Sequence, residues 1–103
     1  MKFKLFSVVF ILISASSFAT TENLKSVDRL GVQGDNAYFT VKEGFSQNCK
    51  WGNIYLNIST HFGKAAYANI LSAKASGKKL SRIDYSQSAD GEQCNLSLVE
   101  VRD

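Results

Sequence analysis

Apolar and polar residues alternate along several stretches of the chain, and this alternation predicts strands. Between residues 54 and 58 every second residue is aliphatic, which is the spacing of a half-buried strand, and a bulge is expected at Gly52. Residues 27–33 and 37–42 have strand spacing and composition. The turn sequence Gly-Asp-Asn at residues 34–36 separates them, so the two stretches are predicted to form a hairpin.

A different composition between residues 62 and 76 predicts the one helix of the chain. This stretch is rich in alanine, which has the highest helix propensity. Ser59 or Thr60 can cap its N-terminus, and Gly77 is expected to end it in the left-handed conformation.

The predicted order of strands and helix limits the possible folds to two architectures. Residues 80–85 and 94–102 complete a set of five strands, and residues 20–25 are expected to be a loose polar lead-in. One helix between the third and fourth of five strands is the order of a small OB-like barrel. An α+β domain with an antiparallel sheet packed on one helix has the same order, so both architectures remain open.

The N-terminus has the features of a cleavable secretory signal peptide over residues 1–19. Lys2 and Lys4 precede an apolar segment at residues 5–13 that is too short to span a bilayer. Ser17 and Ala19 provide the small residues that signal peptidase accepts, so cleavage is expected after Ala19. The protein is therefore predicted to be exported, to the periplasm or the medium, without a membrane anchor after cleavage.

Cleavage leaves a single small domain, residues 20–103, with little net charge. Two of the 12 basic residues lie in the signal peptide and all nine acidic residues lie outside it, so the mature net charge is +1. A nucleic-acid partner is not expected, because such binding needs a basic patch.

The two cysteines, Cys49 and Cys94, are predicted to form a disulfide, because the destination of an exported protein is oxidising. Closing a loop of about 46 residues stabilises a domain by roughly 4 kcal/mol in the chain-entropy model. Metal binding is not expected, since the single His61 and two distant cysteines cannot supply four ligands.

The second half of the chain resembles known proteins. The stretch from Cys49 through the helix sequence KAAYANILSAKASGKKL to Cys94 and the closing LSLVEV resembles a group of small exported bacterial proteins of unknown function. It is more loosely similar to the B subunits of ring-forming bacterial toxins, which are disulfide-bonded OB-folds that bind glycans. The resemblance implies an exported bacterial domain and transfers no functional residue.

Residues that catalysis would require are present but not arranged in a known motif. His61 stands alone next to the expected helix cap, and no nucleophile motif accompanies it. Asp84, Asp90 and Glu92 do not match a calcium-loop spacing and are expected to be solvated loop charges. An enzyme is therefore not predicted, and no cofactor is expected.

Aromatic residues are the candidates for ligand binding. Trp51 has polar and amide neighbours such as Asn53, and an indole face beside amides can stack on a sugar ring. Alternatively, Trp51 packs against the disulfide as part of the core. Tyr38, Tyr55 and Tyr85 alternate with polar neighbours and are expected to line one sheet face, as a ligand site, an oligomer interface or core.

Three functional hypotheses follow. The first is an exported noncatalytic binding or adaptor domain, whose unknown protein partner docks at an uncovered strand edge or on the aromatic residues. The second is a glycan-binding, toxin-like B subunit that forms a ring and is therefore a homo-oligomer. The third is a small periplasmic hydrolase or an inhibitor of such an enzyme.

Overall fold

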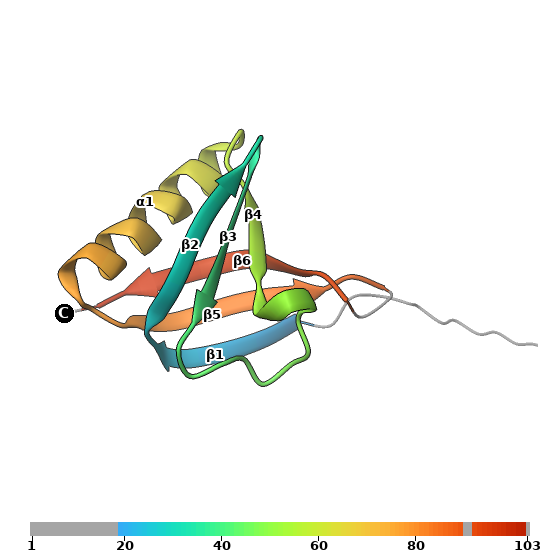
Figure 1. The fold of residues 1–103 in the computed structure, drawn as a ribbon, viewed down its shortest axis with the longest axis horizontal. Coiled ribbons are helices and arrows are strands. Elements are labelled where there is room, and N and C mark those ends of the chain that lie inside the picture. The colour runs from blue at the N-terminus through green and yellow to red at the C-terminus, as the bar shows by residue number, and fades with distance from the viewer. Residues whose placement is uncertain (1–18, 90–91, 103) are drawn as a thin grey trace, which may run out of the picture.

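A computed structural model describes residues 19–89 and 92–102 of the 103-residue chain (Figure 1). The predicted signal peptide, except Ala19, and Asp90 lie outside the described residues. In the described ranges no helix is long and apolar enough to cross a membrane. The elements in chain order are β1 (Ala19–Lys25), β2 (Val27–Gln33), β3 (Asn36–Val41), the 3₁₀ turn η1 (Lys50–Gly52), β4 (Ile54–Asn57), α1 (His61–Ser76), β5 (Leu80–Gln87) and β6 (Cys94–Val101).

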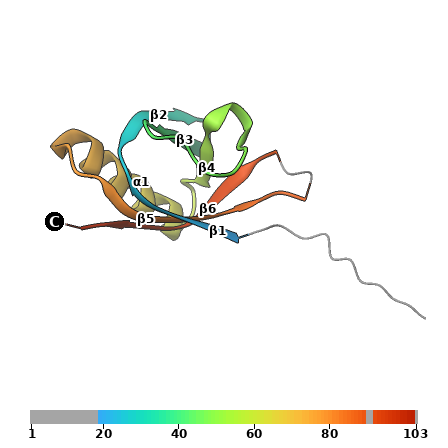
Figure 2. The same ribbon diagram turned by 90° about the horizontal axis from the view of Figure 1, so that it is seen from below.

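The six strands form one mixed sheet in the order β1-β5-β6-β4-β3-β2. All neighbours are antiparallel except β4 and β6, which run parallel and pair at Ile54 with Cys94. The two outer strands, β1 and β2, follow each other in the chain and are separated only by Ser26. The sheet therefore bends back on itself into two layers, β2-β3-β4 and β1-β5-β6 (Figure 2).

The predicted fold class is wrong in its strand count and in the position of the helix. The chain forms neither a five-stranded OB-like barrel nor an antiparallel sheet with the helix between the third and fourth strands. It has six strands in one mixed sheet, and α1 lies between the fourth and fifth of them. The fold remains a small α+β fold.

The additional strand is β1, which the sequence predicts to be a loose lead-in. Its residues are mostly polar and exposed, so no apolar alternation marks it as a strand. Backbone pairing with β5 and one inward carboxylate hold it in place instead. That carboxylate belongs to Glu22, which is buried and accepts hydrogen bonds from the Tyr85 hydroxyl at 2.6 Å and from Ser46.

The core lies between the sheet layers and α1, which contacts β6, β2 and β4. The helix approaches the sheet closely because Gly63 faces the β4 end. A Cβ atom at this position would lie 1.7 Å from the backbone oxygen of Asn57. The largest fully buried side chains are those of Tyr85, Phe39, Ile54, Ile70, Leu80, Ile83 and Cys94.

The predicted hairpin and the helix ends are confirmed. Strands β2 and β3 pair antiparallel, with Gln33 opposite Asn36 across a two-residue turn. The Thr60 hydroxyl accepts a hydrogen bond from the Gly63 amide at 2.9 Å, and Gly77 ends α1 with φ of 73°.

The predicted disulfide between Cys49 and Cys94 is also confirmed. It joins the residue before η1 to the first residue of β6, with the Cα atoms 5.4 Å apart. A bulge was expected at Gly52, but the chain instead makes the turn η1 before β4. This turn determines how Trp51 is presented.

Candidate ligand-binding surface

Trp51 occupies the centre of η1 in a backbone conformation that is unfavourable for a bulky side chain. Its φ and ψ angles are 57° and 18°, and Gly52 follows with φ of 70°. For a residue other than glycine this left-handed region costs about 1–2 kcal/mol, because Cβ approaches the following carbonyl oxygen. The indole is 72% exposed, so core packing does not compensate for this cost.

The turn is fixed on both sides of Trp51. The disulfide links Cys49 to β6, and the Lys50 amide donates to the Glu92 carbonyl at 2.7 Å. Within the turn the amides of Gly52 and Asn53 donate to the carbonyls of Cys49 and Lys50 at 2.9 and 3.1 Å. The tryptophan is therefore displayed from a rigid position and not from a free loop.

Lys50 supports one face of the indole. Its ammonium lies 4.8 Å from the ring centroid of Trp51 and 3.9 Å from the carboxylate of Glu92. Because the indole remains largely exposed, most of the ring surface is still open to solvent.

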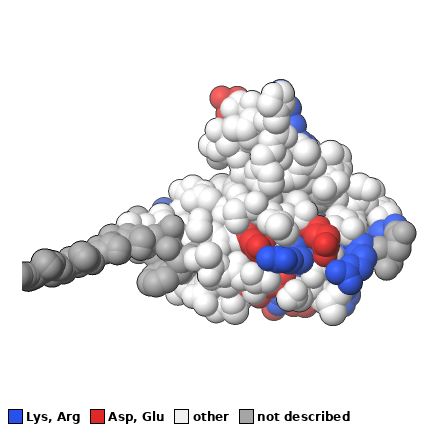
Figure 3. Space-filling view, turned by 180° about the vertical axis from the view of Figure 1, so that it is seen from behind, with Lys and Arg blue, Asp and Glu red and all other residues white. Residues whose placement is uncertain are grey.

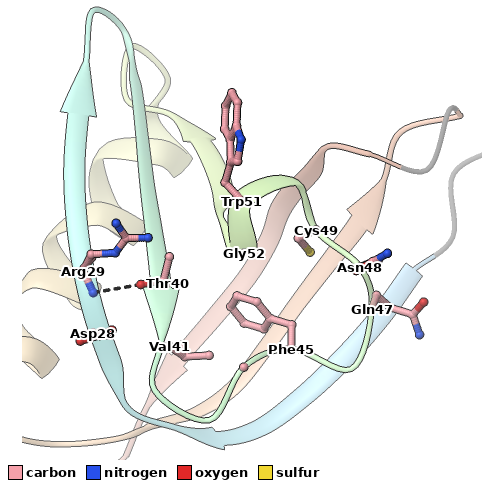
Figure 4. Close-up of a pocket in the computed structure, with 11 residues that line it drawn as sticks. Asp28, Arg29, Thr40, Val41, Phe45, Gln47, Asn48, Cys49, Trp51 and Gly52 are labelled. Carbon is pink, nitrogen blue, oxygen red and sulfur yellow. Dashed lines mark hydrogen bonds between the residues drawn. The ribbon is translucent and has the colours of Figure 1, made fainter.

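Two shallow hollows flank Trp51 and share both this residue and Arg29. The larger, of about 370 Å³, lies between the outer face of β2 and β3 and the loop before η1 (Figure 4). The smaller, of about 300 Å³, extends over the outer face of β3 and β4. The residues that line the smaller hollow are Arg29, Gln33, Tyr38, Trp51, Asn53 and Tyr55.

The tyrosines of the smaller hollow are held by close packing. The rings of Tyr38 and Tyr55 have centroids 6.1 Å apart and an interplanar angle of 51°. Tyr38 lies against Gly31 on β2, where a Cβ atom would come within 2.4 Å of the tyrosine ring. Gly31 therefore lets the Tyr38 ring lie flat on the strand surface.

Asn53 lies at the base of this hollow with an unsatisfied amide. Its side chain is only 7% exposed, and its Nδ2 donates to the Tyr55 hydroxyl at 3.2 Å. Its Oδ1 is buried without a hydrogen-bond partner among the described residues. A buried polar atom of this kind costs about 1–3 kcal/mol, and such atoms are rare in folded proteins.

Arg29 adds a positive charge to the wall of both hollows. Its backbone amide donates to the Thr40 hydroxyl at 3.1 Å, which fixes this part of β2. Its guanidinium lies on the same side of the sheet as the Trp51 indole (Figure 4). Within residues 19–89 and 92–102 this guanidinium has no ion-pair partner.

The structure places two of the predicted binding residues on the surface and buries the third. Trp51 and Tyr55 line the same hollow, and Tyr38 lies beside them. Tyr85 is fully buried in the core and presents no surface to a ligand. Its inward position follows from the hydrogen bond to Glu22, which lets a tyrosine hydroxyl be buried at low cost.

Tyr85 and Glu22 each change the pKa of the other. Burial and the hydrogen bond to Glu22 raise the pKa of Tyr85 to about 12. For Glu22, burial acts to raise the pKa, but hydrogen bonds from Tyr85 and Ser46 and the charge of Lys25 outweigh it, and the net pKa is lowered. None of these side chains lines either hollow beside Trp51, but Phe45, which lines the larger hollow, packs against Tyr85 with ring centroids 5.5 Å apart.

The remaining candidate residues in the described ranges are His61 and the acidic residues Asp84 and Glu92. No group of three or more His, Cys, Asp or Glu side chains is placed to hold a metal ion there. His61 is exposed at the first turn of α1. Asp84 was expected to be a solvated loop charge, but it lies within β5, where its carboxylate forms an ion pair with Arg82 at 2.9 Å. On the face shown in Figure 3, acidic and basic side chains lie next to each other and do not form a patch of one charge.

Sequence reasoning missed Arg29 and Gly31 as parts of the site. Both lie on β2, about 20 residues from Trp51, and only the sheet topology brings them beside η1. One feature of the sequence could have identified these residues: the predicted hairpin places one face of residues 27–33 beside Tyr38.

Comparison with protein-family models, with curated proteins and with solved structures gave no match to this chain. The fold and the surface define its class: a small disulfide-linked α+β domain that displays an exposed tryptophan above an aromatic and amide-lined hollow.

Proposed function

We propose that this protein is an exported, noncatalytic binding domain whose ligand site is the surface around Trp51. The observation that carries the proposal is that Trp51 is exposed and held in the left-handed conformation on a disulfide-linked turn. A bulky residue at such a position lowers folding stability, and strained residues that persist are concentrated at functional sites.

The side chains around Trp51 favour a saccharide as the ligand. The smaller hollow combines three aromatic rings with the side-chain amides of Gln33 and Asn53. Aromatic faces pack against the apolar faces of sugar rings, while amides pair with hydroxyl groups in either direction. A volume of about 300 Å³ is at the lower end of the range for ligand pockets, which suits one or two sugar units.

The proposal is tested by glycan-array binding of the mature protein and two variants. Trp51→Asn removes the indole, and Leu24→Asn is the matched control, because Leu24 is also exposed, at 63%, and has φ of 55°. We expect wild type and Leu24→Asn to bind the same glycans and Trp51→Asn to bind none of them. Equal binding by Trp51→Asn, or no glycan bound by wild type, would contradict the proposal.

A further inference from the structure

The smaller hollow has one charged lining residue, Arg29, and this residue is the basis of a more specific inference. Gln33, Tyr38, Trp51, Asn53 and Tyr55, which complete the lining, are neutral. Asp28 carries the nearest negative charge in sequence, but it lines the larger hollow and not the smaller one. The electrostatic character of the smaller hollow is therefore positive.

The guanidinium of Arg29 has no ion-pair partner in the described part of the chain, in contrast to the other arginines. Arg82 and Arg102 are paired with Asp84 and Glu100 at 2.9 and 3.3 Å. Arg29 thus retains its full capacity for a bidentate pair with an incoming carboxylate.

A second, independent observation indicates that the hollow is prepared for a polar ligand. Asn53 lies at its base, more than nine-tenths buried, and its Oδ1 has no partner in residues 19–89 and 92–102. Rotation of the amide exchanges Oδ1 with Nδ2 but leaves one of the two atoms unsatisfied, because the Tyr55 hydroxyl engages only one. The unsatisfied atom has almost no solvent-exposed surface, so a ligand hydroxyl pairs with it only after the side chains that cover it move.

We propose that this hollow binds a saccharide that carries a carboxylate, that is, a sugar acid such as a uronate. Arg29 pairs with the carboxylate, Trp51 packs against the ring, and Asn53 pairs with a hydroxyl. This inference rests on the proposed function and makes it more specific. Arg29 is the residue that distinguishes an acidic from a neutral sugar.

The test is calorimetric titration of the mature protein with matched pairs of oligosaccharides. Oligomers of galacturonate, glucuronate and mannuronate are compared with their methyl esters, which keep the ring and hydroxyl groups but lose the charge. Wild type is expected to bind at least one acid about tenfold or more tightly than its ester, since a charge-assisted pair is lost.

Three variants separate the contributions. Arg29→Gln is expected to bind acid and ester equally, and Arg29→Lys to retain part of the preference, because lysine keeps the charge without the bidentate geometry. Arg82→Gln is the control for the loss of one exposed positive charge, and it should behave as wild type. Trp51→Asn should bind neither form.

Two results would overturn the inference. Equal affinity of wild type for every acid and its ester would show that Arg29 does not select acidic sugars. Glycan binding that depends on Trp51 would still support the proposed function in that case. Failure of every acid to bind would reject the sugar-acid ligand, and the glycan array with Trp51→Asn would then decide the proposed function separately.

Discussion

At the scale of single residues, the described part of the chain contains two exposed apolar side chains in left-handed backbone, Leu24 and Trp51. The sequence could identify Trp51 as a candidate because of its polar neighbours, but it could not decide between an exposed and a buried indole. That choice depends on the φ angle that η1 imposes, which no local pattern encodes. Leu24 interrupts the pairing of β1 with β5 and lines none of the hollows around Trp51.

Replacing either residue by asparagine should stabilise the fold, because asparagine tolerates the left-handed region. We expect Trp51→Asn and Leu24→Asn each to raise the free energy of unfolding by about 0.5–1 kcal/mol. Urea denaturation followed by circular dichroism measures this change. A loss of more than 1 kcal/mol in Trp51→Asn would show that the indole stabilises the fold, contrary to its exposure.

Glu22 provides a prediction about pH. Its pKa in the folded protein is below the ordinary value of 4.5, so its stabilising effect is fully present above that pH and is lost as the pH falls through the folded pKa. Glu22→Gln should therefore reduce stability at pH 7 by about 1–2 kcal/mol and flatten the decline in stability below pH 4.5. Urea midpoints measured from pH 3 to pH 7 test both effects.

Parallel loss of stability on acidification in wild type and Glu22→Gln would show that other carboxylates cause the decline. Tyr85→Phe is a useful companion variant, since it removes one of the donors to Glu22 and keeps the aromatic ring in the core.

At the scale of elements, the sequence predicted the strands and the helix that have a local sequence pattern, and it missed β1, which has none. The hairpin, the helix and its caps follow from turn chemistry, alanine content and a glycine stop. Strand β1 has no apolar alternation, because its inward position is occupied by a hydrogen-bonded carboxylate. The parallel pairing of β4 with β6 depends on long-range topology, which is why the strand order could not be predicted.

The close approach of α1 to β4 gives a test at this scale. Glycine to alanine in a helix usually stabilises by up to about 1 kcal/mol. At Gly63 the added methyl group would overlap the Asn57 carbonyl, so Gly63→Ala should instead destabilise by about 1–3 kcal/mol. Alanine at exposed Ser72, on the outer side of the same helix, is the control and should be neutral or stabilising. A stabilised Gly63→Ala variant would contradict the packing of α1 on β4.

At the scale of the whole molecule, the disulfide connects the display of Trp51 to the stability of the domain. Cys49 and Cys94 enclose η1, β4, α1 and β5 in one covalent loop, with 45 residues of sequence separation. The sequence predicted this pair from the compartment alone. It could not predict that the bond also fixes the turn beside the hollow, because that requires the register of β4 against β6.

Removing the disulfide should therefore weaken folding and binding together. The double variant Cys49→Ser and Cys94→Ser is expected to lose roughly 4 kcal/mol of stability in the chain-entropy model. At temperatures where it remains folded, its affinity for a ligand of wild type should also fall, because η1 loses one of its attachments. Unchanged stability after reduction would indicate that the loop is already constrained without the bond.

The fluorescence of Trp51 shows directly whether the surface around this residue is the ligand site. Trp51 is the only tryptophan in the chain, so its emission, excited selectively over that of the four tyrosines, reports on this site alone. We expect emission typical of a solvent-exposed indole and efficient quenching by acrylamide in the free protein. A saccharide found on the glycan array should shift the emission to shorter wavelength and protect it from quenching. Binding of that saccharide with unchanged emission and unchanged quenching would contradict the account, because it would place the ligand elsewhere on the molecule.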